Sequence, residues 1–483
     1  MYKTIAQLSI EDFIFPYGTL SPDNRWVKLA GLVPWDDIER CYAAKFVNNG
    51  APAHPARMAL GALIIKQMLG VSDEELVCQI AENAYLQYFI GLKAFSESCP
   101  FGASTLVAFR KRFTEDDVSS INEMILAGSE EKRCVKDDPG KDDPPVAGTM
   151  ALDATVAPSD VTYPQDVKLL NGARERLEDI IDNICKQTGA PRPRMYRQVA
   201  RKDFLDWSKS KKRSYKKTRT ALRRQLQYIR RDLGYVQALR SELDPELSER
   251  QTQLLETIEV VYDQQLYLYE NHTHSVPDRI VSIPQPWVRP VVRGKANANT
   301  EFGAKLHVST DDDGYVRAEK LSFDVYNESE GLIGAAERYR DRTGHYPERI
   351  LADQIYRNRG NLSWCKERGI RLSGPRLGRP PKDHEVSRAS KTTERKDAAD
   401  RNIVEAVFGT TKQAYGLDRV DARTQQTTKT VISLAIVAFN LKKMLVASLF
   451  EILLAKIEGI EVAVFALTDE QRRLLANYRL VTE

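Results

Sequence analysis

The sequence predicts an α/β protein: a mixed sheet flanked by helices, divided by a long helical insertion and preceded by an all-α domain. Residues 1 to about 130 carry the apolar spacing and capping residues of short helices. Residues 166–270 are also helical in pattern, whereas the alternating apolar residues of strands occur near residue 150 and again from residue 304. The 483 residues provide for about three folding units of ordinary size.

Composition excludes several classes of protein. The six cysteines are scattered without a C-x-x-C spacing, which argues against a structural zinc site and against a secreted disulfide framework. The first residues lack a signal-peptide pattern, so we expect a cytoplasmic protein. The apolar stretch at 431–456 is interrupted by Asn440, Lys442 and Lys443, so we expect a buried helix and no membrane span. A net charge of +4 indicates no particular partner.

Residues 1–135 are predicted to form an N-terminal helical domain that binds DNA or mediates dimerisation. One apolar helix ends before Gly70, which has the position of a C-cap, and Ser72 with Glu75 matches a capping box. A later helix ends in the basic residues 110–112. Short helices with a basic edge are typical of helix-turn-helix modules, and a plain helical bundle with a solvated face fits the pattern equally well.

A linker and a strand follow the helical domain. Residues 136–147 are rich in Pro and Asp, which predicts a linker. Residues 148–158, GTMALDATVAP, then alternate as a short strand that is closed by Pro158 and has Asp153 in its middle.

The insertion, residues 166–275, is predicted to be coiled-coil-like. Apolar residues at 222–239 recur every three or four positions, which predicts a seam against an antiparallel helix around 254–261. Residues 194–231 hold fifteen Lys and Arg against two Asp. This excess of positive charge indicates nucleic-acid binding; a solvated face or a contact with a second protomer is the alternative. The candidate DNA-binding residues are Lys211, Lys212, Arg213, Lys216 and Lys217.

The remaining elements complete the predicted sheet domain. In chain order they are a hairpin at 304–326, a helix at 328–342, a strand at 349–353, a helix at 358–366, a strand at 369–373, a loop at 374–396 and a helix from about 400.

With the insertion removed, this order of elements matches the ribonuclease-H-like fold, a mixed sheet flanked by helices. We therefore expect a catalytic domain made of residues 148–165 and 276–420. Residues 421–483 are expected to form C-terminal helices that pack on it.

Three acidic residues are predicted to meet at one edge of this sheet. Asp153 lies in the first strand, Asp353 ends a strand expected beside it, and Glu405 lies one turn into the last helix of the domain. Clustered carboxylates repel one another unless cations neutralise them, and their hard oxygen atoms select Mg²⁺ or Mn²⁺. Two such ions about 3.5–4 Å apart can promote phosphodiester cleavage and transfer. We expect these three acids to bind two Mg²⁺ ions, with Mn²⁺ as the alternative, and to be catalytic.

Seven ordered stretches of the chain resemble the DDE transposases of bacterial insertion sequences, and together they cover most of its length. They lie at 54–92, 152–166, 293–309, 326–332, 346–361, 373–380 and 401–417. The resemblance implies an acidic triad, which falls position by position on Asp153, Asp353 and Glu405.

A related signature of such enzymes places basic residues around the last acid. Arg401 stands four residues before Glu405, and Lys412 stands seven after it. These offsets put all three on one helical face, where Arg401 and Lys412 can hold DNA phosphates. The alternative for these two residues is an ion pair and a plain surface charge. The tyrosine of the signature is replaced by Ala398 here.

Two weaker signals lie elsewhere. Residues 376–382, RLGRPPK, resemble a minor-groove arm in which Arg376 and Arg379 contact DNA, and a mobile loop is equally consistent. His272 and His274 have no accompanying ligands at metal-binding spacing, so no metal site is expected there.

These features together predict a DNA transposase that binds the terminal inverted repeats of its insertion sequence and catalyses metal-dependent strand cleavage and strand transfer. Its partners are double-stranded DNA at the element ends and the target, and a homodimer is expected on DNA. The expected location is the bacterial cytoplasm, at the nucleoid. The alternatives are a domesticated, catalytically inactive DNA-binding protein and a simple ribonuclease-H-like nuclease.

Overall fold

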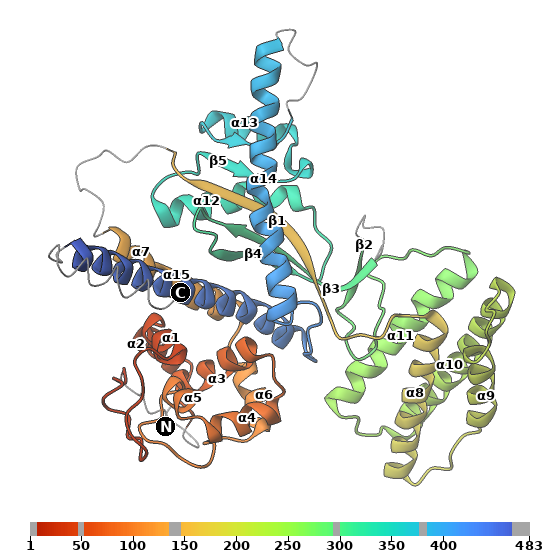
Figure 1. Cartoon of the computed structure of the whole chain (residues 1–483). Coiled ribbons are helices and arrows are strands. Elements are labelled where there is room, and N and C mark those ends of the chain that lie inside the picture. The colour runs from red at the N-terminus through yellow and green to blue at the C-terminus, as the bar shows by residue number, and fades with distance from the viewer. Residues whose placement is uncertain (1–6, 47–52, 135–145, 293–299, 376–383, 466–483) are drawn as a thin grey trace, which may run out of the picture.

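The computed structural model describes residues 7–46, 53–134, 146–292, 300–375 and 384–465 (Figure 1). The linker predicted at 136–147 therefore lies almost wholly outside the described residues. Its last residues join the sheet domain, since Val146 forms an isolated β-bridge with Tyr346.

The N-terminal part is helical, as predicted. Gly70 ends one helix with a φ of 65°, and the Ser72 side chain accepts a hydrogen bond from the backbone N–H of Glu75, so both expected caps are confirmed. The helices are α1 (Arg25–Leu32), α2 (Trp35–Ala43), α3 (Ala56–Leu69), α4 (Asp73–Glu82), α5 (Ala84–Phe89), α6 (Ala103–Arg112) and α7 (Glu115–Cys134).

The basic end of α6 is used mainly inside this domain. Arg110 forms a two-pronged ion pair with Asp73, and the Arg112 guanidinium lies over the ring of Phe46. The basic edge noted in the sequence is therefore largely occupied by contacts within the domain.

The insertion folds into α8 (Asp166–Thr188), α9 (Arg197–Ser208), α10 (Tyr215–Leu243) and α11 (Glu249–Glu270). The expected turn between the last two helices is present, with Asp244 in a left-handed conformation at φ 41°. Apolar residues of α10 share one core with α11, as predicted, and also with α8. The expectation of helix throughout is wrong at 189–196 and 209–214, because Gly189 ends α8 at φ 72° and a turn precedes α10.

The sheet is mixed and has six strands: β1 (Thr149–Pro158), β2 (Arg289–Val292), β3 (Thr300–Thr310), β4 (Val316–Ser322), β5 (Arg349–Leu351) and β6 (Arg371–Leu372). Strand β1 lies between β3, which is antiparallel to it, and β5, which is parallel. Strand β6 extends the parallel side, while β2 and β4 pair with the other edge of β3. Of these strands, β2 was not predicted.

Helices cover both faces of the sheet. Met150 and Leu152 of β1 pack with residues of α12 (Gly331–Thr343) and α13 (Arg359–Glu367). Ala151 and Ala157, which point to the other face, pack with α14 (His384–Ala414) and α15 (Gln425–Phe465). Short 3₁₀ turns, η1 (Glu328–Glu330) and η2 (Gln354–Tyr356), precede the first two of these helices.

The loop predicted at 374–396 is wrong in its second half. Helix α14 begins at His384, so residues 384–396 are helical. The Gly- and Pro-rich composition that suggested a loop ends at Pro381, and residues 384–396 contain neither residue type. No residue after Pro381 therefore breaks the helix. Residues 376–383 lie outside the described part of the chain.

Helix α15 belongs to two cores. Ile432 and Ile436 pack against the sheet domain, whereas Leu434, Leu441 and Leu445 pack against the N-terminal helices. Figure 1 shows α15 running between these two parts. Within the described residues, Gln425–Phe450 is long and apolar enough to span a membrane, and 67% of its apolar window is buried in the protein. This burial agrees with the core helix that the sequence predicted.

Candidate active site

The pairing of β1 with β5 brings two of the predicted acids to the same edge of the sheet. Met150 pairs with Ile350 and Ala151 with Leu351 in parallel register. Asp153 and Asp353 thus occupy equivalent places, each two residues beyond the last pair. The predicted adjacency of their strands is confirmed.

Asp353 is held by the turn that it begins. Its carboxylate accepts a hydrogen bond from the backbone N–H of Gln354 at 2.8 Å and caps η2. At the end of η2, the buried Tyr356 hydroxyl lies 2.9 Å from Nε2 of His307 on β3. Burial, followed by nearby basic side chains, lowers the pKa of His307 to about 4, so this imidazole is neutral at pH 7.

Helix α14 supplies the third acid together with Arg401. One guanidinium nitrogen of Arg401, Nη1, lies 3.7 Å from Oδ1 of Asp353, and Nη2 lies 3.6 Å from Oε1 of Glu405. The two carboxylates are each 60% exposed, so these ion pairs contribute little to stability. Their importance is positional: one cation lies between two of the predicted acids.

Asp153 is the least exposed of the three acids, and its pKa is raised. Burial is the main cause, and the charges of Glu328 and Asp353 raise the pKa further. A hydrogen bond from the backbone N–H of Ala154 and the charge of Arg401 act in the opposite direction. The raised pKa therefore reflects mainly burial, and a cation bound beside Asp153 would stabilise its ionised form.

Glu328 is an acidic neighbour that the sequence reasoning missed. It begins η1, and its carboxylate lies 2.8 Å from Nζ of Lys305. Acidic residues are common at the starts of helices, so its position in the sequence carried no separate signal.

Two further acids orient α14. Asp397 is 4% exposed and forms ion pairs with Arg371 of β6 and Arg349 of β5. Asp400 pairs with the same Arg349 at 2.6 Å. Because Arg349 also donates a hydrogen bond to Thr149 of β1, the helix is tied to both strands that present the acids. The sequence analysis missed both residues, because their arginine partners lie on strands 26 to 51 residues away in the sequence.

The carboxylate oxygens of Asp153, Asp353 and Glu405 are the donor type that Mg²⁺ and Mn²⁺ prefer. Across the described ranges, however, no three His, Cys, Asp or Glu side chains are grouped closely enough to hold a metal ion. Arg401 instead pairs with Asp353 and Glu405. The carboxylate donors fit a divalent cation, but their side chains do not converge on one point in this structure.

The predicted DNA-binding residues are distributed over several places. Lys412 is half-buried near the end of α14, and Arg376 and Arg379 lie outside the described residues. The other candidates are exposed between α9 and the first turn of α10, within the helical insertion: Lys211, Lys212, Arg213, Lys216 and Lys217. The structure thus places the basic insertion apart from the acids.

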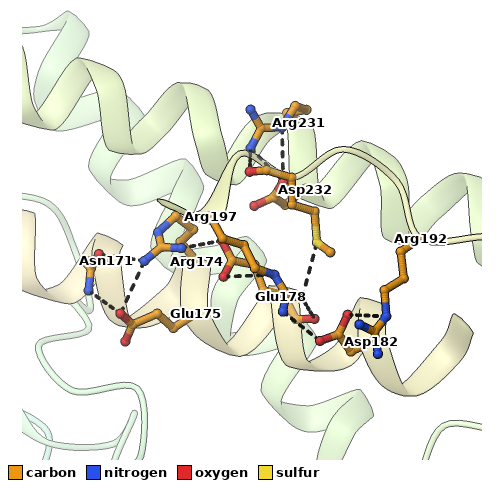
Figure 2. A network of polar contacts seen from close by, with 10 residues as sticks. Asn171, Arg174, Glu175, Glu178, Asp182, Arg192, Arg197, Arg231 and Asp232 are labelled. Carbon is orange, nitrogen blue, oxygen red and sulfur yellow. Dashed lines mark hydrogen bonds and ion pairs between the residues drawn. The ribbon is translucent and has the colours of Figure 1, made fainter. Parts of the chain in front are cut away.

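A polar network stabilises the basic insertion from inside (Figure 2). The buried Arg174 of α8 binds Glu178, which also faces Arg197 of α9. Arg231 of α10 pairs with the fully buried Asp232, whose pKa burial raises to about 6. Part of the positive charge counted in the sequence is therefore compensated by acids within the insertion.

Comparison with known proteins agrees with this arrangement. A family model described as a transposase DDE domain matches residues 350–442, and one described as a transposase domain (DUF772) matches residues 16–112. A protein of Rhizobium meliloti, described as uncharacterized protein ORF8 in the nfe locus, is 30% identical over 158 residues, which are 33% of this chain and 73% of that protein. No solved structure matches the chain significantly.

An N-terminal transposase domain followed by a DDE domain defines the transposase class of proteins. This chain belongs to that family, the DDE transposases of insertion sequences. The DDE match includes Asp353 and Glu405, whereas Asp153 lies before it.

Proposed function

We propose that this protein is a DNA transposase that binds the terminal inverted repeats of its insertion sequence and catalyses metal-dependent strand cleavage and strand transfer. One observation carries the proposal: Asp153 and Asp353 lie at equivalent places on adjacent parallel strands, and Arg401 links Asp353 to Glu405. The mixed sheet with helices on both faces supports a ribonuclease-H-like catalytic domain.

In this proposal Asp153, Asp353 and Glu405 hold two Mg²⁺ ions, or Mn²⁺. When bound, such ions lower the barrier to phosphodiester cleavage by stabilising the charge on the attacking and leaving oxygens. The protein's own residues position the DNA: Arg401 and Lys412 bind phosphates beside the acids. The ion pairs of Asp397 and Asp400 keep α14 in place while the substrate is bound.

The remaining parts are proposed to supply affinity for DNA. The exposed residues Lys211, Lys212, Lys216 and Lys217 make no ion pair within the described part of the chain, so they are free to contact phosphates. The N-terminal helices would recognise the element ends, and Arg376 and Arg379 would insert into the minor groove of the DNA. Because two ends must be processed together, we propose a homodimer on DNA, acting at the nucleoid in the cytoplasm.

A cleavage and joining assay on DNA that carries an element end tests this function. With Mg²⁺ present, the wild-type protein should cut and join this DNA. Asp153→Asn, Asp353→Asn and Glu405→Gln should each lose more than about 100-fold in rate, about 2.7 kcal/mol of transition-state stabilisation. Asp324→Asn, at an exposed aspartate after β4, is the matched control and should keep full activity.

Three outcomes would contradict the proposal in different ways. Undiminished cutting by Asp353→Asn would remove the role of this carboxylate. Tight binding without cutting by the wild-type protein would favour an inactive DNA-binding protein. Cutting without joining would favour a simple nuclease.

A further inference from the structure

Helix α14 presents two contrasting faces. The face toward the sheet domain is buried or ion-paired and contains Asp397, Asp400, Val404, Val407 and Thr411. Figure 1 shows the first turns of α14 projecting beyond β5 and α13. The outward side of these turns is therefore open to solvent or to a ligand.

The outward face carries a basic stripe, defined here as Arg388, Lys391 and Arg395. The three residues step by three and four, so they lie on one side of the helix, and all are exposed. None of them forms an ion pair among the residues that the structure describes. Glu394, which precedes Arg395 in the chain, accepts a hydrogen bond from Ser390 and interacts with the charge of Arg357.

The same face continues to the candidate active site. Continuing from Arg395 in steps of three and four, the chain passes Ala398 and Asn402 and reaches Glu405. The two intervening side chains are small and exposed, so a bulky ligand can approach the helix closely. The stripe thus leads along one helix toward the candidate catalytic acid, and at 3.6 residues per turn Glu405 lies about 100° around the helix axis from Arg388.

Three cations that form no ion pair with a described residue lie within about 10 Å of helix and repel one another, and a polyanion would stabilise them. Duplex DNA offers regularly spaced phosphates, which fit cations that recur once per turn of helix. An acidic peptide would also be attracted, but the alignment with Glu405 favours the DNA on which that acid is proposed to act.

We propose that the basic stripe of α14 is a DNA-backbone contact surface that holds the duplex flanking the cleaved phosphodiester. The inference rests on the proposed function, because it requires the acids to act on DNA. From Glu405 to Arg388 the helix rises about 26 Å, which corresponds to about 7–8 base pairs of duplex. The stripe therefore contacts the backbone about that far from the cut.

The salt dependence of DNA binding tests the stripe in the full-length protein. The probe is duplex DNA of mixed sequence, because phosphate contacts do not depend on sequence. Each phosphate contact contributes about 0.9 to the slope of log K against log salt concentration, so the triple variant Arg388→Gln, Lys391→Gln, Arg395→Gln should lower that slope by about 2–3.

Two matched variants on α14 distinguish a specific DNA contact of the basic stripe from a general effect of positive charge. Lys391→Gln should lower the slope by about 1. Lys396→Gln removes the same charge from an exposed position on another side of α14 and should leave the slope unchanged. Thermal unfolding should be unchanged in all variants, because every substituted side chain is exposed.

The outcomes distinguish this inference from the proposed function. If the wild-type protein binds DNA and the triple variant keeps its slope, the stripe is not a contact surface, and the proposed function stands. Equal effects of Lys391→Gln and Lys396→Gln would also overturn the inference. If the wild-type protein does not bind DNA at all, both proposals fail.

Discussion

Arg401 is the residue on which the electrostatics of the candidate site depend. Its guanidinium pairs with Asp353 and Glu405, and its charge also lowers the pKa of Asp153. A divalent cation bound by the same carboxylates would compete with this side chain. DNA phosphates, which attract a guanidinium, would relieve the competition.

Replacing Arg401 with Gln should therefore have opposite effects on two ligands. Affinity for Mn²⁺ in the absence of DNA should rise up to about 5-fold, because exposed ion pairs are worth at most about 1 kcal/mol. Affinity for duplex DNA should fall. Calorimetric titration with Mn²⁺ measures the first effect, and Arg423→Gln, at an exposed arginine before α15, is the control. Unchanged or weaker Mn²⁺ binding would contradict this account of Arg401.

At the scale of elements, the sequence predicted most of the sheet and the two acids that its strands present. The prediction was wrong or incomplete where local composition suggested a different structure, and where interacting residues lie far apart in the sequence. The loop expected up to residue 396 hid the basic stripe. The ion pairs of Asp397 and Asp400 were missed because their arginine partners lie on β5 and β6, distant in the sequence. Glu328 was missed because an acid at a helix start is ordinary, and its closeness to Asp153 arises only from tertiary packing, in which η1 lies against η2. The link between Glu405 and Asp353 through Arg401 depends on tertiary contacts, which no local pattern contains.

The insertion contains a buried acid whose ionisation should affect stability. Burial is the main cause that raises the pKa of Asp232 to about 6, and the charge of Glu178 adds to it. The neighbouring Arg231 and the charge of Arg174 act in the opposite direction. A raised folded-state pKa means that the native state binds more protons than the unfolded chain between about pH 4 and 6. Stability from this group is thus present at low pH and is lost as the pH rises through that interval.

Asp232→Asn should remove this pH dependence. Relative to the wild-type protein, the free energy of unfolding of the variant should increase by about 1–3 kcal/mol between pH 4 and pH 7. Urea unfolding followed by circular dichroism at both pH values measures the difference. A constant difference between the two proteins across this range would show that Asp232 has an ordinary pKa.

At the scale of the whole molecule, α15 joins the helical domain to the sheet through a buried amide. Asn440 donates to the carbonyl of Val316 on β4 at 2.7 Å and to Oδ1 of Asn122 on α7 at 2.8 Å. Its own side-chain oxygen accepts from the backbone N–H of Val316 at 2.9 Å. One side chain therefore satisfies polar groups of both parts.

Asn440→Ala should destabilise the protein by about 2–4 kcal/mol, because it leaves buried polar groups of two elements without partners. Differential scanning calorimetry should show a lower unfolding temperature, and the two parts should begin to unfold in separate transitions. Asn402→Ala, at an exposed position, should have almost no effect. An unchanged melting profile for Asn440→Ala would show that this amide does not couple the parts.

Because α15 packs into two cores, it also fixes the distance between the N-terminal helices and the sheet domain. The N-terminal helices, which would bind an element end, cannot move away from the sheet domain, which would cut the DNA, unless one of those cores opens. The protein would therefore fix the number of base pairs between the bound end sequence and the cleavage site. Adding about five base pairs there, half a turn of the double helix, would carry the scissile bond to the far side of the duplex.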